Sequence, residues 1–120
     1  MAEADRFKRW FLQEQDLAGL DPVKARDLII KCFYEAQKET FARSKQELGL
    51  STNDEQLHAS VQTAIKLVFK EIGEDFEKPT KATLMKVVDV LGRRASAWGT
   101  PQDIIEHHKG QIQKVLTILK

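Results

Sequence analysis

Apolar residues recur every three or four positions through most of the chain, which is the period of an amphipathic helix. Three stripes of this kind stand out, and each spans several helical turns. Their members are Leu57, Val61, Ala64, Ile65, Val68 and Ile72; Leu84, Val87, Val88, Leu91, Ala95 and Trp98; and Ile104, Ile105, His108, Ile112, Val115, Leu116 and Leu119. No segment alternates apolar and polar residues over the length of a strand. The pattern therefore predicts an all-α protein.

A fourth long helix is predicted between Pro22 and Leu48, because Asp21 is a good N-cap and Gly49 a good C-terminal stop. Its apolar residues cover well over a third of its circumference, so we expect it to be central and to contact at least two neighbours. Comparable start and stop signals bound the other three helices. These signals are residues 51–55 with Gly73, Thr80 with Gly99, and Thr100 with Pro101.

Helices joined by short connections favour antiparallel neighbours. We therefore expect an up-and-down four-helix bundle over about residues 21–120. The aromatic residues Phe7, Trp10 and Phe11 predict a short additional helix ahead of it, within residues 4–17. Together these elements form one domain that spans residues 1–120.

The composition fits a folded domain and names no activity. Hydrophobic residues make up 42% and charged residues 31% of the 120 positions, with a net charge of +1. The charge is uneven, because residues 1–77 hold 11 Lys/Arg and 15 Asp/Glu (net −4), whereas residues 78–120 hold 8 and 3 (net +5). The two parts either attract one another within the fold or offer a basic surface to an acidic partner. The near-neutral total argues against nucleic acid as the partner.

The sequence favours a cytoplasmic, non-enzymatic protein without metal or cofactor. Cys32 is the single cysteine, and there is no apolar leader and no apolar stretch of bilayer length. Glu55 and His58 have the spacing used in di-iron helical bundles, but the second copy that such a site needs is missing. Zinc-binding spacings, phosphate-binding loops and nucleophile motifs are also missing.

His108 is the main candidate for a ligand site, because it lies within the apolar face of the last predicted helix. A buried imidazole needs a polar partner, so a core histidine bonded to a neighbour is the simpler interpretation. A ligand site would draw on Cys32 and Tyr34 of the central helix, while His107 is expected to face solvent. Residues 107–110 also resemble the histidine phosphotransfer pattern, in which lysine and glycine follow the histidine at +3 and +4, but here the spacing is out by one.

The segment 87–96 resembles the first helix and turn of a helix-turn-helix, with Gly92 as the turn and Arg93 opening a recognition helix. However, its apolar face continues in phase through Gly92, which favours one unbroken helix. In that helix, Lys86 and Arg93 share an exposed basic face that suits a protein or a phosphate group better than duplex DNA.

The leading hypothesis is a small helical domain that works through contacts with a protein partner or with a second copy. Its candidate contact residues are Phe7, Trp10, Phe11, Lys86 and Arg93. The N-terminal aromatics either close an open end of the bundle or form an exposed arm. The alternative hypothesis is a ligand- or metal-binding bundle whose site lies around His108, Cys32 and Tyr34.

Overall fold

The computed structural model describes residues 10–48, 54–95, 97 and 99–119, with side chains for all of these except 42–48 and 54. Within these residues the helices are α2 (Glu14–Leu17), α3 (Pro22–Leu48), α4 (Asp54–Glu71), α5 (Lys81–Ala95) and α6 (Gln102–Ile118). No strand occurs in the part of the chain that is described, which confirms the all-α prediction.

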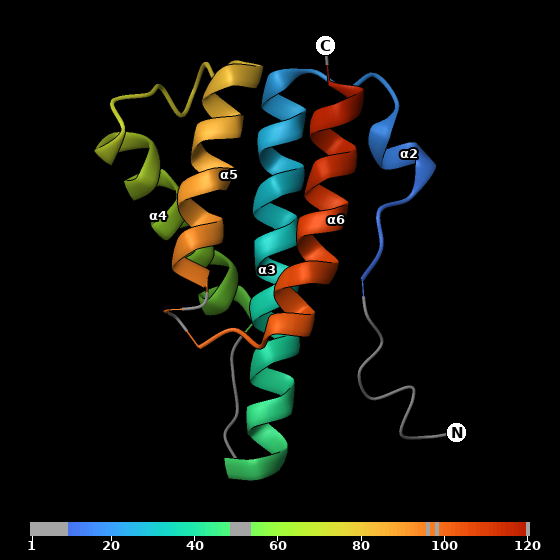
Figure 1. Cartoon of the computed structure of the whole chain (residues 1–120), viewed down its shortest axis with the longest axis vertical. Helices are drawn as coiled ribbons and strands as arrows, with labels where there is room; N and C mark the ends of the chain where they lie inside the picture. The colour runs from blue at the N-terminus through green and yellow to red at the C-terminus, as the bar shows by residue number, and fades with distance from the viewer. Residues whose placement is uncertain (1–9, 49–53, 96, 98, 120) are drawn as a thin grey trace.

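Helix α3 is the central element, as its broad apolar surface predicted. It packs against α4, α5 and α6, and α5 also packs against α4 and α6. Figure 1 shows α3 between α5 and α6, with α4 inclined behind them and the C-terminal part of α3 extending past the ends of its neighbours. One buried stripe of α3 follows alternating spacings of four and three: Ala25, Ile29, Cys32, Ala36 and Glu39. This stripe faces α6, because Glu39 contacts His108 there.

Hydrogen bonds confirm two of the predicted helix starts. Oδ1 of Asp21 accepts the Lys24 N–H at 2.8 Å, and Oγ1 of Thr80 accepts the Thr83 N–H at 3.1 Å. Each side chain satisfies a backbone donor that the first turn leaves without an intrahelical partner. The signals at Gly49 and residues 51–53 lie outside the described residues.

The C-terminal end of α5 differs from the prediction. The helix ends at Ala95, whereas the apolar pattern continued to Trp98, which is outside the described residues. The chain turns here because Gly99 has a φ of +84° and the Thr100 N–H donates to the Ala95 carbonyl at 3.2 Å. Helix α5 is continuous through Gly92, so the helix-turn-helix interpretation is wrong.

The predicted helix over residues 4–17 is wrong for residues 10–13, which are not helical, and residues 4–9 lie outside the described residues. Among residues 10–17, the helix is Glu14–Leu17. The N–H of Gln13 donates to Oδ2 of Asp16 at 2.8 Å, which fixes the helix start after Gln13. The backbone ahead of it is bonded to side chains of α6, as described below. We call residues 10–13 the strap.

Candidate functional site: a groove and a strap on two sides of α6

A groove of about 1030 Å³ lies between α5 and α6, and residues of α3 form part of its lining. We call it the α5–α6 groove. Its apolar lining comes from all three helices: Phe33 and Ala36 of α3, Met85 and Val88 of α5, and Ile105, Ile112 and Leu116 of α6. Met85 in this lining is 54% exposed. The groove is therefore a partly apolar surface that the described residues leave open.

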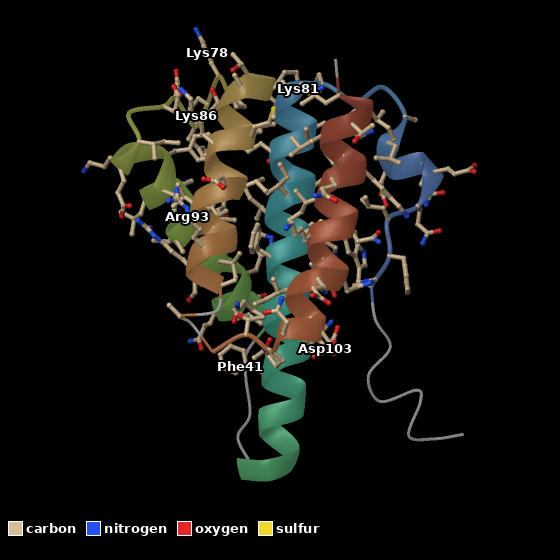
Figure 2. The ribbon with its side chains drawn as sticks, viewed as in Figure 1. Phe41, Lys78, Lys81, Lys86, Arg93 and Asp103 are labelled. Atoms are coloured by element: carbon tan, nitrogen blue, oxygen red, sulfur yellow. The ribbon has the colours of Figure 1, made fainter. Side chains whose placement is uncertain are left out.

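Charged residues of both signs line the groove. Three are basic (Lys81, Arg93 and Lys109) and two are acidic (Asp89 and Glu106). Arg93 and Asp89 form an ion pair at 3.0 Å, and both side chains are exposed, so the pair contributes little to stability. Figure 2 shows Lys81 near the upper end of α5 and Arg93 farther down the same helix. The lining of the groove thus has a small excess of positive charge.

Gly92 lies in this lining, in the interior of α5. A Cβ atom built on it would meet nothing within 4 Å, and the same holds for Gly110 of α6, which does not line the groove. A glycine inside a helix costs about 1 kcal/mol relative to alanine. Packing within this chain therefore explains neither glycine. At Gly92 the missing side chain leaves the backbone of α5 open to a close approach from the groove.

Beneath the groove, the buried imidazole of His108 lies beside the carboxylate of Glu39 of α3. Its Nε2 lies 3.9 Å from Oε1 of Glu39, and the two side chains are only 4% and 7% exposed. His108 also lines the groove, and its ring lies parallel to that of Trp10, with ring centroids 6.5 Å apart. Glu39 is thus a polar neighbour of this buried histidine, at a separation longer than a hydrogen bond.

The other two candidate ligand residues lie elsewhere on α3. Tyr34 makes an edge contact with the His58 ring of α4, at 5.2 Å between centroids. Since Tyr34 and Glu39 are five residues apart, they point about 140° apart around the helix. Cys32 shares the face of Glu39 but lies about 10 Å along the axis from it. The helix geometry therefore separates Tyr34 from the His108–Glu39 pair.

Cys32 is buried and has no nucleophilic character at neutral pH. Burial raises the pKa of its thiol from 9.0 to about 12, and the negative charges of Glu35 and Asp16 act in the same direction. A thiol with this pKa stays protonated and reacts slowly. The described residues also contain no group of three or more histidine, cysteine or acidic side chains arranged to hold a metal ion.

On the other side of α6, the strap is bound through its backbone. The Nε2–H of His107 donates to the Trp10 carbonyl at 2.9 Å, and the Leu12 N–H donates to Oε1 of Gln111 at 2.9 Å. The Phe11 ring makes an edge contact with the His107 ring at 4.7 Å. Trp10 and Leu12 are partly buried against the core, whereas Phe11 is 53% exposed.

These contacts correct the expectation that His107 faces solvent, because the side chain is half-buried under the strap. The phosphotransfer interpretation needs an exposed histidine, but His108 is buried and His107 is bonded to the strap. The interpretation therefore has no support in the geometry. Of the N-terminal aromatics, Trp10 packs on the bundle, Phe11 is exposed, and Phe7 lies outside the described residues.

The basic residues of α5 have different neighbours, although Lys86 and Arg93 are seven positions apart and lie on the same side of the helix. Lys86 forms an ion pair with Glu74 at 3.3 Å, and Arg94 forms one with Glu71. These pairs join α5 to α4 and the segment after it, whereas Arg93 lines the groove. Lys86 and Arg93 thus have different surroundings.

A smaller apolar hollow of about 360 Å³ lies between α3 and α4. Phe33 and Gln37 line both this hollow and the α5–α6 groove, and Phe41 at its edge is 39% exposed. Figure 2 shows Phe41 at the lower end of the packed part of the bundle.

Two residues of this region were missed in the sequence. Glu39 is a charged residue at a position where the four-and-three spacing of α3 calls for an apolar one, and that mismatch was a usable signal. Gln111 follows His107 by four positions and His108 by three, so the three share a side of the helix. Nothing in the sequence indicated that an extended segment would bind there.

Comparison of the chain with protein-family models, curated proteins and solved structures finds no match. Among the described residues, no helix combines the length and the apolar character needed to cross a lipid bilayer.

Proposed function

We propose that the protein is a non-enzymatic interaction domain whose α5–α6 groove binds an acidic amphipathic helix of a protein partner. The observation that carries the proposal is the groove itself, which is large, partly apolar and open along two helices. Helix-in-groove binding uses this kind of surface, with apolar anchors at i, i+3, i+4 and i+7 of the bound helix. The groove residues of α5 run from Lys81 to Ala95, which corresponds to about 21 Å of helix.

Charge favours an acidic partner over a second copy that presents the same face. Residues 78–120 have a net charge of +5 (8 Lys/Arg minus 3 Asp/Glu), and they include both walls of the groove. Within the lining of the groove the excess is smaller, three basic against two acidic side chains, and Arg93 is paired with Asp89, so charge disfavours two such faces only slightly. Glutamates flanking an apolar stripe would meet Lys81 and Lys109. Gly92 lets the bound helix approach the α5 backbone closely.

The test uses a designed helical peptide with leucine at every third or fourth position and glutamate elsewhere, together with a twin in which lysine replaces each glutamate. Amide chemical shifts of the full chain are followed during titration with each peptide. We expect the acidic peptide to shift resonances of α5 and α6, to bind more weakly in added salt, and to bind more tightly than its basic twin. Equal binding of both peptides, or shifts confined to other helices, would contradict the proposal.

Two exposed apolar residues supply a matched pair of variants. Met85 in the groove is 54% exposed, and Leu67 on α4, outside the groove, is 52% exposed. Met85→Glu places a negative charge in the groove and is expected to lower the affinity for the acidic peptide at least tenfold, which corresponds to about 1.4 kcal/mol. Leu67→Glu changes the net charge equally and is expected to leave binding within about twofold. Equal losses in both variants would exclude the groove as the binding site.

The alternative function, a ligand-binding bundle centred on His108, is supported by one observation: this buried histidine lines the groove and lies beside Glu39. Titration with Zn²⁺ or with inorganic phosphate, read on the imidazole resonances of the three histidines, tests this alternative. A shift of His108 alone, lost in His108→Gln, would favour it. Unchanged resonances would leave the helix-binding function as the explanation of the groove.

The finer architecture is also an inference. We infer that the four long helices form an up-and-down bundle, because consecutive helices pack on one another and short connections join the described ends of α4, α5 and α6. Distances between spin labels placed at both ends of α3 and α6 would test this order. The cytoplasmic location rests on the sequence and stays a prediction.

A further inference from the structure

We propose that the strap is exchanged between two copies of the chain, so that the strap of one copy binds α6 of the other. The acceptor site consists of His107, His108 and Gln111, and in the structure the chain's own strap occupies it. A second copy carries an identical strap, so the fit between acceptor and occupant is already present in the molecule.

The strap is bound in a way that suits exchange. It makes its contacts as an extended segment through two hydrogen bonds, the ring contacts of Trp10 and Phe11, and the packing of Trp10 and Leu12 against the core. None of these contacts requires the strap and α6 to belong to the same chain. The same bonds and ring contacts form in either arrangement, and only the link between the strap and α3 has to change direction.

Gly19 is the hinge of that link. It lies between α2 and α3 with a φ of +62°, a conformation that residues other than glycine adopt at a cost. The Nζ of Lys24 also donates to the carbonyl of Ala18, which holds the link against α3. Leu17 of α2 also packs partly buried against the core, so a hinge at Gly19 exchanges α2 together with the strap.

At low protein concentration the strap binds its own α6 in preference to that of a second copy, because the tether gives it a high effective concentration there. Backbone strain at Gly19 in the arrangement where the strap binds its own α6 reduces this preference for intramolecular binding without changing the acceptor site. Gly19→Pro does so selectively, since proline fixes φ near −65° and cannot adopt the observed angle. Ala18 already has a φ of −70° and a ψ of 131°, which a following proline accepts. A larger side chain at position 19 meets no neighbour within 4 Å, so backbone strain is the main effect.

The test measures self-association of the full chain by sedimentation velocity over a range of concentrations, with circular dichroism to verify the helical fold. Gly19→Pro is expected to lower the dimer dissociation constant at least about tenfold relative to the wild-type chain. Gly19→Ala can still adopt a positive φ at some cost. Its dimer dissociation constant is therefore expected to lie between those of Gly19→Pro and the wild-type chain. A folded Gly19→Pro variant that remains monomeric at millimolar concentration would overturn the proposal.

A second substitution in the Gly19→Pro chain tests whether the dimer forms through the strap site. Gln111→Leu removes the acceptor of the Leu12 N–H at a buried position of similar volume, and it is expected to return the dimer to monomer. Gln113→Leu makes the same substitution at an exposed position two residues away and is expected to leave the dimer intact. A dimer that survives Gln111→Leu, or that both substitutions abolish equally, would show that the association does not use the strap site.

Discussion

Helix α6 presents two unlike surfaces to its surroundings. On one, His107 and Gln111 are covered by the strap, which receives a hydrogen bond from one and gives a hydrogen bond to the other. On the other, Ile105, Ile112 and Leu116 line a groove that nothing in the described chain fills. A segment of the same chain thus covers the polar surface, whereas none of the described residues covers the partly apolar one. Since apolar burial is the stronger drive in folding, an apolar surface left open is the one that calls for a functional explanation.

The largest predicted effect concerns the Glu39–His108 pair, which lies between the two surfaces. Glu39→Leu leaves the buried His108 without this carboxylate and should lower the free energy of unfolding by up to about 3 kcal/mol. The double variant Glu39→Leu/His108→Leu replaces both partners with apolar groups and should recover most of that loss. Urea unfolding of the single and double variants measures both effects. Additive losses in the double variant would show that the pair is not coupled.

The second prediction concerns Cys32 on the buried stripe of α3. Above pH 9 the thiol of the unfolded chain loses its proton, whereas the folded chain keeps it up to a pKa of about 12. The folded state then binds more protons, so the free energy of unfolding falls as pH rises, by about 1.4 kcal/mol per pH unit. Below pH 9 the thiol makes no pH-dependent contribution.

Urea unfolding of the wild-type chain and of Cys32→Ala at pH 7, 9 and 10.5 measures this pH dependence of the free energy of unfolding. The wild-type chain should lose about 2 kcal/mol more than the variant between pH 9 and 10.5, because only the wild type has a thiol to ionise. Asp16→Asn, which removes a charge that helps raise this pKa, should reduce the difference. Parallel pH profiles for the wild type and Cys32→Ala would indicate that the thiol is accessible to solvent.

The third prediction separates the two aromatic residues of the strap. Trp10→Ala removes a half-buried ring that packs against the core and should lower the free energy of unfolding by about 1.5 kcal/mol. Phe11→Ala removes a ring that is 53% exposed and should change it by less than about 0.5 kcal/mol. Urea unfolding of both variants measures the difference. Equal effects would mean that the strap binds through its hydrogen bonds and not through the packing of Trp10.

The contrast between the two surfaces also explains what the sequence could predict. Periodicity identifies the helices and the buried stripes, because both depend on local spacing. Asp21 and Thr80 predict helix starts because a cap acts within one turn of its own residue. The strap escaped prediction because its hydrogen bonds join positions 97 and 99 residues apart, so no local pattern records them. The groove escaped for a similar reason, since Met85 and Ile112 look like core residues until the distance between their helices is known.

The smallest predicted effect on stability is the most informative about the open surface. Gly92→Ala and Gly110→Ala each replace a helical glycine whose surroundings have room for a methyl group, so each should raise the free energy of unfolding by about 1 kcal/mol. Only Gly92 lines the groove, and its methyl group would keep a bound helix away from the α5 backbone. The acidic peptide should therefore bind Gly92→Ala several-fold more weakly than the wild type and bind Gly110→Ala unchanged. Stabilisation by both substitutions, with lost binding in only one, would show that the glycine of α5 is kept for the partner. Unchanged binding in Gly92→Ala would place the partner helix elsewhere along the groove.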